Sequence, residues 1–245
     1  MNITIDSGNS STKVGFFEND SLVKIVVLEN INQLDGLLRE YKNASVIISS
    51  VNLAYGTIKE KLKDFKRILS LDQFTKIPLG NKYQSPETLG MDRLAASVGA
   101  RHFCKTGNCL IIDAGSCITY DLVDVENNYQ GGSISPGIQI RFKSLHAFTS
   151  KLPLMHVHDY ANQLKLPLTG KNTRESILSG VINGMVAEVN GIIQEYHNLY
   201  PDLRILICGG DANYFESKIK QSIFAIPELV HWGLNRILAH NESEF

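Results

Sequence analysis

The sequence predicts an α/β protein of two lobes built on mixed sheets, and three observations support this prediction. The chain has 245 residues, which is enough for one large domain or two smaller ones with real cores. Runs of β-forming residues come before and between helical patterns in the first 70 residues. A second strand pattern then restarts at Cys109, as expected if the chain contains two related units.

The first part of the chain reads as strands and helices in an order that requires a mixed sheet. Three strands come first, then a helix, then a strand in "ASVIISSV", then another helix. Such an order places helices on a sheet with both parallel and antiparallel neighbours. The predicted strands are Asn2–Asp6, Thr12–Glu18 and Leu22–Leu28, and the last helix starts at about Tyr55.

The second part begins with "LIIDAGSCITYDLVDVENNYQGGSI", which again reads as strands. Helical patterns dominate from Gly137 onward, most clearly over Thr173–Tyr200. The segment "RILICGG" predicts one late strand that ends at a pair of glycines.

An Asp-x-Gly turn occurs at the start of both parts, in the same register. When the first segment is shifted by 107 positions, four of its residues fall on identical residues. A hairpin chosen only for its turn residues has no reason to recur in this way, although Asp, Ser, Gly and Asn are ordinary hairpin residues. The recurrence therefore predicts a duplicated strand-turn-strand unit; the matched residues are Ile5, Asp6, Gly8 and Thr12 with Ile112, Asp113, Gly115 and Thr119.

Such a pair of turns is suited to hold phosphate groups. Glycine lets backbone N–H groups approach phosphate oxygens without a Cβ, and nearby hydroxyls add donors. A carboxylate beside phosphate repels it unless a cation lies between, so Asp6 and Asp113 are candidate positions for Mg²⁺ or another hard cation. The sequence contains no GxxxxGK[ST] and no GxGxxG, which excludes those two routes to phosphate binding.

Charge and composition favour a small substrate. Lys and Arg total 24 against 25 Asp and Glu, for a net charge of −1, so nothing indicates nucleic acid or an anionic membrane as partner. The start at Met1 lacks a secretory pattern, and we find no uninterrupted apolar run of about 18 residues. We therefore expect a cytoplasmic protein whose four cysteines are reduced and hold no structural zinc; these are Cys104, Cys109, Cys117 and Cys208.

Several separate motifs resemble one kinase family. The two Asp-x-Gly turns are similar to the phosphate motifs of the superfamily of acetate and sugar kinases, actin and heat-shock ATPases. Within it, the chain resembles the type III pantothenate kinases over nearly its whole length. The matching segments are "DSGNSSTK", "GMDR", "DAGSCITYD", "GGSISPG" and "CGGDA".

The resemblance implies two actin-like (ribonuclease H-like) lobes, residues 1–108 and 109–245, with duplicated strand-turn-strand phosphate motifs. It also implies ATP-dependent phosphorylation of pantothenate at its primary hydroxyl, the first step toward coenzyme A. Mg²⁺, a monovalent cation (K⁺ or NH₄⁺) and a homodimer follow from the same resemblance. In the two turns, Ser10 and Ser116 replace the usual Thr, which keeps the hydroxyl and loses a methyl group.

Roles carry over to the positions that match the family's motifs. Asp92 is expected to accept the proton of the substrate hydroxyl, Asp113 to ligate the monovalent cation, and Asp6 to bind Mg²⁺ directly or through water. Arg93 is expected to donate to substrate or phosphate oxygens and to offset the charge of Asp92. The ATP contacts are Asp6, Ser7, Gly8, Asn9, Ser10, Ser11, Thr12, Lys13 and Ser116, and the pantothenate contacts are Tyr83, Gly90, Met91, Asp92, Arg93 and Thr173.

Each of these segments also has a purely structural interpretation. Gly90–Arg93 can be the start of a helix, and Thr173 can be the N-cap of the helix opened by "NTRES". Gly131–Gly137 can be a loop, whereas the glycine pair after "ILIC" is well placed to receive adenosine. "HVHD", His156–Asp159, places two imidazoles on one face of a strand, but no third and fourth zinc ligand is evident.

Two rival functions remain at this point. One is a nucleotide-binding accessory or regulatory relative without kinase activity, which would need neither a base at Asp92 nor a cation site at Asp113. The other is a sugar kinase of the same superfamily, from which the Gly-x-Asp-Arg motif separates this chain.

Overall fold

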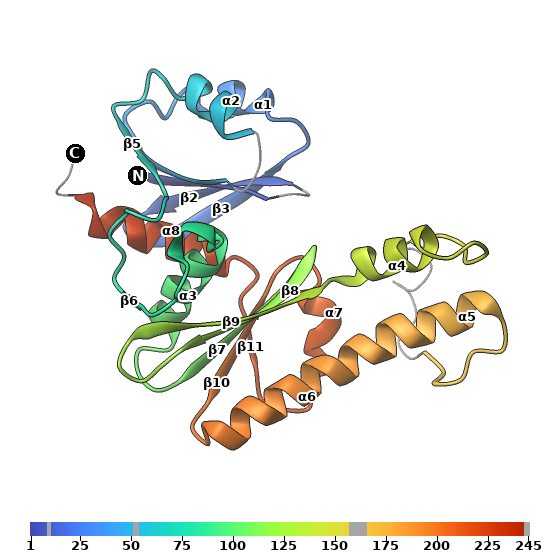
Figure 1. Cartoon of the computed structure of the whole chain (residues 1–245). Helices are drawn as coiled ribbons and strands as arrows, with labels where there is room; N and C mark the ends of the chain where they lie inside the picture. Colours follow the sequence, from blue (N-terminus) through green and yellow to red (C-terminus); the bar gives the residue numbers. More distant parts are fainter. Residues whose placement is uncertain (9–10, 51–53, 157–165, 243–245) are drawn as a thin grey trace. The chain divides into compact units, whose positions relative to one another are not determined.

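The computed structural model describes residues 1–8, 11–50, 54–156 and 166–242 (Figure 1). They form two compact units. The first comprises Met1–Cys109, Asp121–Gly131 and Glu228–Phe245, and the second comprises Leu110–Tyr120 and Gly132–Pro227. The first unit thus includes two segments from later in the chain, Asp121–Gly131 and Glu228–Phe245, so the compact units are not two consecutive halves of the chain. The division into lobes 1–108 and 109–245 stays a prediction.

The first unit is built on a five-stranded mixed sheet with the strand order β3-β2-β1-β4-β5. The hairpin of β1 and β2 pairs antiparallel, as does β2 with β3, whereas β4 runs parallel to both β1 and β5. This mixture confirms the sheet predicted from the order of elements. The strands are β1 (Asn2–Ser7), β2 (Thr12–Glu18), β3 (Ser21–Leu28), β4 (Ser45–Ser50) and β5 (Arg67–Ser70).

Apolar side chains of these strands form a core with two short helices. Ile3, Ile5, Val14 and Phe16 are all fully buried there. Their burial follows from strands rich in β-branched and aromatic residues, which pack well on a pleated surface. The helices are α1 (Gln33–Leu38) and α2 (Ala54–Lys61).

Two longer helices of the first unit, α3 (Met91–Phe103) and α8 (Leu229–His240), pack against each other with their backbones in close approach. A Cβ added at Gly99 would collide with the carbonyl oxygen of Leu229, and one added at Gly233 would collide with that of Ala95. Only glycine permits this approach, because it has no Cβ. The catalytic motif predicted at Gly90–Arg93 therefore begins a helix that is firmly held along its length.

A second sheet of six strands has the order β11-β10-β7-β8-β9-β6. In this sheet β10 runs parallel to β11, and β6 runs parallel to β9. The predicted late strand is present as β10, and Gly209 follows it with a positive φ of 91°. The strands are β6 (Gly80–Asn81), β7 (Cys109–Ala114), β8 (Cys117–Val123), β9 (Asn128–Pro136), β10 (Arg204–Cys208) and β11 (Phe224–Ala225).

The loop interpretation of Gly131–Gly137 is wrong, because these residues lie mostly within β9 and lead directly into a helix. Gly131 has a φ of 97°, in the region that favours glycine. Gly137 is the N-cap of α4 (Ile138–Ala147). The remaining short elements are the 3₁₀ turn η1 (Pro86–Thr88) and α7 (Ala212–Glu216).

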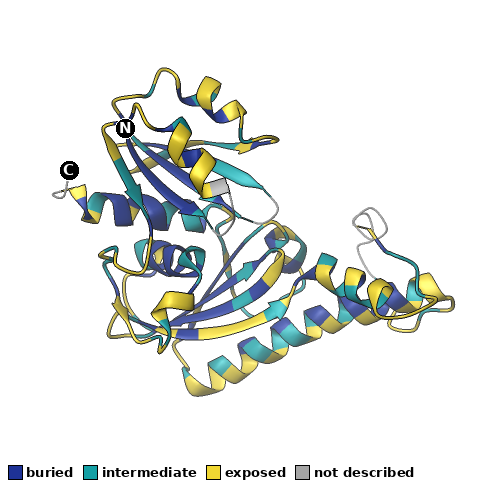
Figure 2. Cartoon of the chain, turned by 45° about the horizontal axis from the view of Figure 1, so that its top comes forward, coloured by how far each residue is buried: buried dark blue, intermediate teal, exposed yellow. Residues whose placement is uncertain are grey.

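The long predicted helix is confirmed over Thr173–Leu199. It consists of α5 (Thr173–Leu178), a π-helical turn (Ser179–Asn183) and α6 (Gly184–Leu199). Figure 2 shows a buried stripe along one side of it and an exposed opposite side, and in α6 the buried residues are Met185, Val189 and Ile193. Spacings of four residues place these side chains on one face.

Thr173 is not the N-cap of this helix. Asn172 takes that position, and its side chain accepts a hydrogen bond of 3.0 Å from the N–H of Glu175. The carboxylate of Glu175 in turn accepts the N–H of Lys171 at 2.8 Å. This reciprocal arrangement satisfies the first N–H groups of the helix and leaves Thr173 exposed at its first position.

The segment Thr173–Leu199 is also long and apolar enough to cross a membrane, with a mean hydropathy of 1.4, which differs from our expectation of no such stretch. However, 44% of that apolar window is buried inside the protein. A core helix of a folded domain meets the same criteria of length and composition, so the segment is weak evidence for a membrane span.

Candidate active site

The first Asp-x-Gly turn joins β1 to β2 in the first unit. The N–H of Gly8 donates to the carbonyl oxygen of Ser11 at 3.1 Å, which closes the turn. The hydroxyl oxygens of Ser7 and Thr12 lie 3.0 Å apart at its base. Asn9 and Ser10, two of the predicted ATP contacts, lie outside the described residues.

Strand register brings Asp6 and Lys13 together. They are directly opposite each other on β1 and β2, so their side chains lie on the same face of the sheet. Ser49 is the partner of Asp6 on the parallel strand β4. Its hydroxyl is buried without a hydrogen-bond partner among the described residues. Sequence reasoning did not select Ser49, because nothing local distinguishes a serine at the end of a buried strand.

The second turn, in the second unit, joins β7 to β8 and is shorter by one residue. The N–H of Gly115 donates to the carbonyl oxygen of Cys117 at 2.9 Å, two residues ahead rather than three. The predicted duplication is thus present as a glycine-closed turn in both units, with a difference in turn length. Asp113 is half-buried one residue before the end of β7, and Ser116 is exposed at the apex of the turn.

Two later glycines pack directly on this second turn. A Cβ at Gly137 would meet the carbonyl oxygens of Gly115 and Ser116, and the N–H of Gly137 donates to Ser116 O at 3.0 Å. A Cβ at Gly209 would meet the carbonyl oxygen of Ala114 and a carboxylate oxygen of Asp113. The glycine-rich segments of the second unit therefore converge on the end of β7.

Asp211 also belongs to this cluster. Its N–H donates to the carbonyl oxygen of Ala114 at 2.9 Å, next to Asp113. Burial raises the pKa of the Asp211 carboxyl above its ordinary value. Carboxylate and backbone carbonyl oxygens therefore lie close together at the end of β7, where they are partly shielded from water.

A hydrogen-bonded network supports the segment that leads to Gly137. The guanidinium of Arg141 donates to Pro136 O at 2.8 Å, to Ser135 Oγ at 2.7 Å and to Glu188 Oε2 at 2.6 Å. Tyr120 donates its hydroxyl to Glu188 Oε1 at 3.2 Å. Helix α6 thereby holds the turn before α4 in place through one carboxylate, a connection that no sequence motif indicated.

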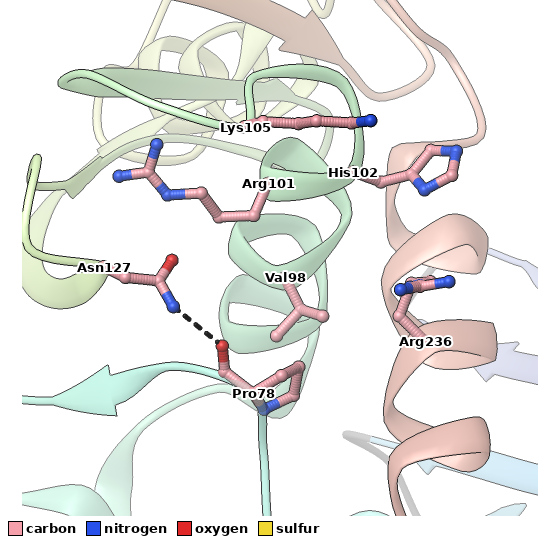
Figure 3. Close-up of a pocket in the computed structure, with 7 residues that line it drawn as sticks. All are labelled: Pro78, Val98, Arg101, His102, Lys105, Asn127 and Arg236. Carbon is pink, nitrogen blue, oxygen red and sulfur yellow. Dashed lines mark hydrogen bonds between the residues drawn. The ribbon is translucent and has the colours of Figure 1, made fainter.

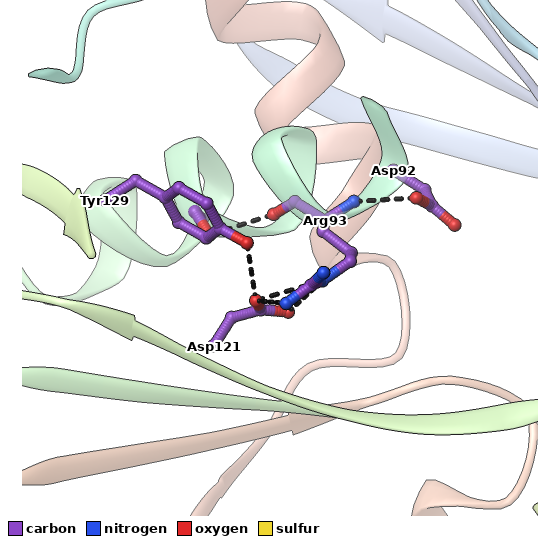
Figure 4. Close-up of polar contacts among 5 residues, drawn as sticks. Asp92, Arg93, Asp121 and Tyr129 are labelled. Atoms are coloured by element: carbon purple, nitrogen blue, oxygen red, sulfur yellow. Dashed lines mark hydrogen bonds and ion pairs between the residues drawn. The ribbon is translucent and has the colours of Figure 1, made fainter. Parts of the chain in front are cut away.

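In the first unit, Arg93 forms a buried network with Asp121 and Tyr129 (Figure 4). Nε of Arg93 lies 3.0 Å from Asp121 Oδ1 and Nη2 lies 2.6 Å from the same oxygen, while the Tyr129 hydroxyl donates to it at 2.7 Å. The Arg93 guanidinium also lies 5.8 Å from the ring centre of Tyr83. Tyr83, a predicted substrate residue, is thus next to the Gly-Met-Asp-Arg segment.

Charge and burial determine the protonation states in this network. Burial alone lowers the pKa of Arg93, but the hydrogen bonds and charge of Asp121 more than offset it, so the pKa lies above its ordinary value. Burial and the Asp121 charge raise the pKa of Tyr129. Arg93 is therefore a cation and Tyr129 a neutral donor, and both point at the Asp121 carboxylate.

Asp92 lies in the first turn of α3, as the helix-start interpretation expects, and it is half-buried. Its Oδ1 accepts the N–H of Arg93 at 2.9 Å. Figure 4 shows the carboxylate pointing away from the Asp121 network. Arg93 forms its described ion pair with Asp121, and the expectation that it offsets the charge of Asp92 stays a prediction.

The segment His156–Asp159, for which the sequence indicates no complete set of zinc ligands, is only partly described. His156 is described, but residues 157–159 lie outside the described residues. Within the ranges that the structure describes, no group of three or more His, Cys, Asp or Glu side chains could hold a metal ion.

Comparison with solved structures shows the fold. The fold is similar to that of a Campylobacter jejuni protein assigned to the Baf family of transcriptional activators (TM-score 0.65, 24% identity, covering 98% of this chain and 99% of that one). It is also similar to glucokinase from an Antarctic psychrotroph (TM-score 0.52, 10% identity, 98% of each chain). The chain therefore has the actin-like α/β fold of the ATPase and sugar kinase superfamily.

Sequence comparison identifies the family. The type III pantothenate kinase family model matches residues 2–195. The type III pantothenate kinase of Phocaeicola vulgatus is 40% identical over 99% of this chain and 100% of its own length, and that of Cytophaga hutchinsonii is 39% identical over 98% and 100%. This chain belongs to the type III pantothenate kinase family.

Proposed function

We propose that this protein transfers the γ-phosphoryl group of ATP to the primary hydroxyl of pantothenate, forming 4'-phosphopantothenate as the first step of coenzyme A biosynthesis. The observation that carries the proposal is its membership of the type III pantothenate kinase family. The two glycine-closed turns and the helix that begins at the Gly-Met-Asp-Arg segment support it. Phosphoryl transfer depends mainly on positioning and charge neutralisation, and backbone N–H groups at glycine turns are suited to position phosphate oxygens.

Asp92 is the proposed general base. Its carboxylate is held in one orientation by the N–H of Arg93, and Oδ2 has no hydrogen-bond partner among the described residues. That oxygen is therefore available to accept the proton of a substrate hydroxyl. Gly90, Met91 and Tyr83 are the proposed neighbours of the substrate in the first unit.

Arg93 acts on the substrate site indirectly in this proposal. Its Nε and Nη2 already donate to Asp121, so the residue fixes the first turn of α3 and leaves less of its donor set for substrate than the sequence indicated. Thr173, exposed in the second unit, is a further proposed pantothenate contact, and we infer a homodimer in the cytoplasm from the family resemblance.

The phosphate groups of ATP are assigned to the two turns. In the first unit we assign Asp6, Ser7, Gly8, Ser11, Thr12 and Lys13, with Asn9 and Ser10 retained from the sequence, and in the second unit Ser116. Lys13 stands opposite Asp6, so it can neutralise either that carboxylate or a phosphate oxygen. Mg²⁺ near Asp6, directly or through water, would neutralise charge on the phosphates during transfer.

The residues around Asp113 fit a monovalent cation. The half-buried carboxylate lies beside Gly209, among the backbone carbonyl oxygens that end β7. K⁺ and NH₄⁺ both accept such an oxygen environment, and a cation there would offset the cost of a partly buried charge. The donor set thus has one carboxylate supplemented by carbonyl oxygens.

The experiment that tests the function is a coupled assay of ADP release with pantothenate, several hexoses, acetate or no acceptor. We expect strong ADP release with pantothenate as acceptor and only background ADP release with the hexoses, acetate or no acceptor. An equal response to a hexose would indicate a sugar kinase instead. Nucleotide binding by calorimetry without turnover on any acceptor would indicate an accessory or regulatory protein.

A further inference from the structure

A basic pocket lies in the first unit at the C-terminal end of α3 (Figure 3). Its volume is about 360 Å³. Arg101, His102 and Lys105 line it from α3 and the segment that follows, and Arg236 lines it from α8, so residues far apart in the sequence meet there. Figure 3 also shows Pro78 and Asn127 at its edge, joined by a hydrogen bond of 3.0 Å.

The positive charge of this pocket is poorly compensated. Lys105 is exposed and has no hydrogen-bond or ion-pair partner among the described residues. Arg101 donates to the carbonyl oxygens of Cys104, Gly107 and Asp124, which carry no full charge, and its Nε is buried without a described partner. An accessible ammonium and an unpaired guanidinium N–H are both suitable donors for an anion.

Asp20 is the carboxylate that pairs with Arg236 and acts on His102. Asp20 Oδ2 is 3.4 Å from Arg236 Nη1, and both side chains are substantially exposed. Exposed pairs of this kind contribute little, because water screens them. Asp20 therefore does not cancel the combined charge of Arg101, Lys105 and Arg236.

His102 is in direct electrostatic contact with this cluster. Its ring stacks on Trp232, with the ring centres 4.9 Å apart and an angle of 15° between the planes. Burial, then the charges of Arg236 and Lys105, lower the pKa of His102, while Asp20 opposes them. Burial first, and then the neighbouring cations, favour the neutral imidazole, and an anion placed among these cations would favour the protonated form.

We propose that this pocket binds a phosphate-bearing anion, held by Lys105, Arg236 and the protonated ring of His102. A tetrahedral phosphate offers several acceptor oxygens to donors that converge from two helices, which suits a guanidinium and an ammonium. The site differs from the proposed substrate site, because Arg101 lies nine residues after Asp92 on the same helix, about 14 Å along its axis. The inference does not depend on the proposed kinase activity.

Trp232 offers a direct readout, since it is the single tryptophan of the chain. A protonated imidazole stacked on an indole ring quenches its fluorescence more strongly than a neutral one. A pH titration of the emission of the full-length protein, without nucleotide, therefore reports the pKa of His102. We expect inorganic phosphate or pyrophosphate to raise the midpoint by about 1 pH unit, the effect of one opposite charge nearby. Glycerol phosphate distinguishes a phosphate ester as ligand from the free anion.

The test variant carries both Lys105→Gln and Arg236→Gln. The control is Lys59→Gln, which removes an exposed positive charge on α2. The double variant removes two like charges, so its midpoint should already be higher without phosphate and should no longer respond to it. The control should respond like the wild type. The proposal would be overturned if chloride at equal ionic strength shifted the midpoint as much as phosphate does. It would also be overturned if the double variant responded to phosphate like the wild type.

Discussion

Arg93 and Asp121 form an ion pair inside the first unit, with Nη2 of the guanidinium 2.6 Å from Oδ1 of the carboxylate. The exposed fractions of the two side chains are 7% and 1%. The pair connects the Gly-Met-Asp-Arg segment at the start of α3 to the strand that follows the second Asp-x-Gly turn. A motif residue that looks like a substrate contact is thus, first of all, a structural anchor for the helix that carries Asp92.

Replacing Asp121 by Asn should therefore destabilise the protein strongly. The substitution keeps the volume of the side chain but leaves a buried guanidinium without its counter-charge, which typically costs about 3–5 kcal/mol. Urea unfolding monitored by circular dichroism would measure the change as a lower midpoint at constant slope.

Asp64→Asn is the matched control, because Asp64 forms an ion pair of 2.8 Å with Lys42 in which both side chains are more than half exposed. Water screens this pair, so the control should unfold close to the wild-type midpoint. Equal behaviour of the two variants would mean that the Arg93–Asp121 pair does not stabilise the fold.

The same pair illustrates what the sequence could and could not predict. The strands of the first 50 residues and the helix start at Gly90–Arg93 follow from local patterns, and they lie within a residue or two of their predicted positions. The short strands β5, β6 and β11 were not predicted, and part of β9 was interpreted as a loop. The partner of Arg93 was not predictable, because Asp121 lies 28 positions away and only the packing of β8 against α3 brings the two together. The quoted motif "DAGSCITYD" ends at Asp121, yet its spacing carries no information about which arginine it meets.

Two other differences between prediction and structure have local causes. Asn172 and Thr173 are adjacent residues with good capping side chains, and propensity alone does not decide between them. The structure places the cap at Asn172, where the amide oxygen reaches Glu175 N. Likewise, the second turn is shorter because the N–H of Gly115 donates to the carbonyl oxygen two residues ahead, whereas that of Gly8 donates to the one three residues ahead. The similar sequences of the two turns do not reveal this difference.

A second prediction concerns Asp92. In Asp92→Asn the side chain keeps its size and can still accept the N–H of Arg93, but it no longer accepts a proton at neutral pH. Loss of general-base assistance typically lowers the rate about 10²- to 10⁴-fold. We expect turnover on pantothenate to fall within that range, with nearly normal ATP binding by calorimetry and a normal melting temperature. A variant that melts earlier yet turns over at the wild-type rate would make Asp92 a helix-start residue alone.

A third prediction concerns the pH dependence of stability. His231 on α8 is 2% exposed, and its Nδ1 lies 2.7 Å from the Thr4 hydroxyl oxygen. Burial, and then the charge of Lys13, lower its pKa to about 3. The unfolded chain has a histidine pKa of about 6.5, so between these values the unfolded state binds more protons than the folded state. The stabilising contribution is thus complete above about pH 6.5 and is lost as the pH falls toward 3.

Urea unfolding at pH 7.5 and 5.0 tests this prediction. The wild type should lose up to about 1.4 kcal/mol per pH unit below pH 6.5 from this one group. His231→Asn should show a smaller loss over the same interval, whereas His240→Asn, at an exposed position of α8, should keep the wild-type dependence. Identical pH dependence in the wild type and His231→Asn would contradict a neutral buried imidazole.

A last prediction uses the two neighbouring glycines after β10. Gly209 has a φ of 91°, and a Cβ there would collide with Ala114 O and a carboxylate oxygen of Asp113, whereas a Cβ at Gly210 would meet nothing within 4 Å. Gly209→Ala should therefore displace the Asp113 carboxylate or the end of β7. Gly210→Ala adds the same methyl group one position later, where it touches neither. If Asp113 holds the monovalent cation, the Gly209 variant needs more K⁺ to reach half-maximal turnover, by about tenfold for each 1.4 kcal/mol of lost binding. The measurement is the K⁺ dependence of ADP release in sodium buffer for both variants. Equal K⁺ requirements in Gly209→Ala and Gly210→Ala would remove Asp113 from the cation site, because the two variants differ in whether the added methyl group touches that carboxylate.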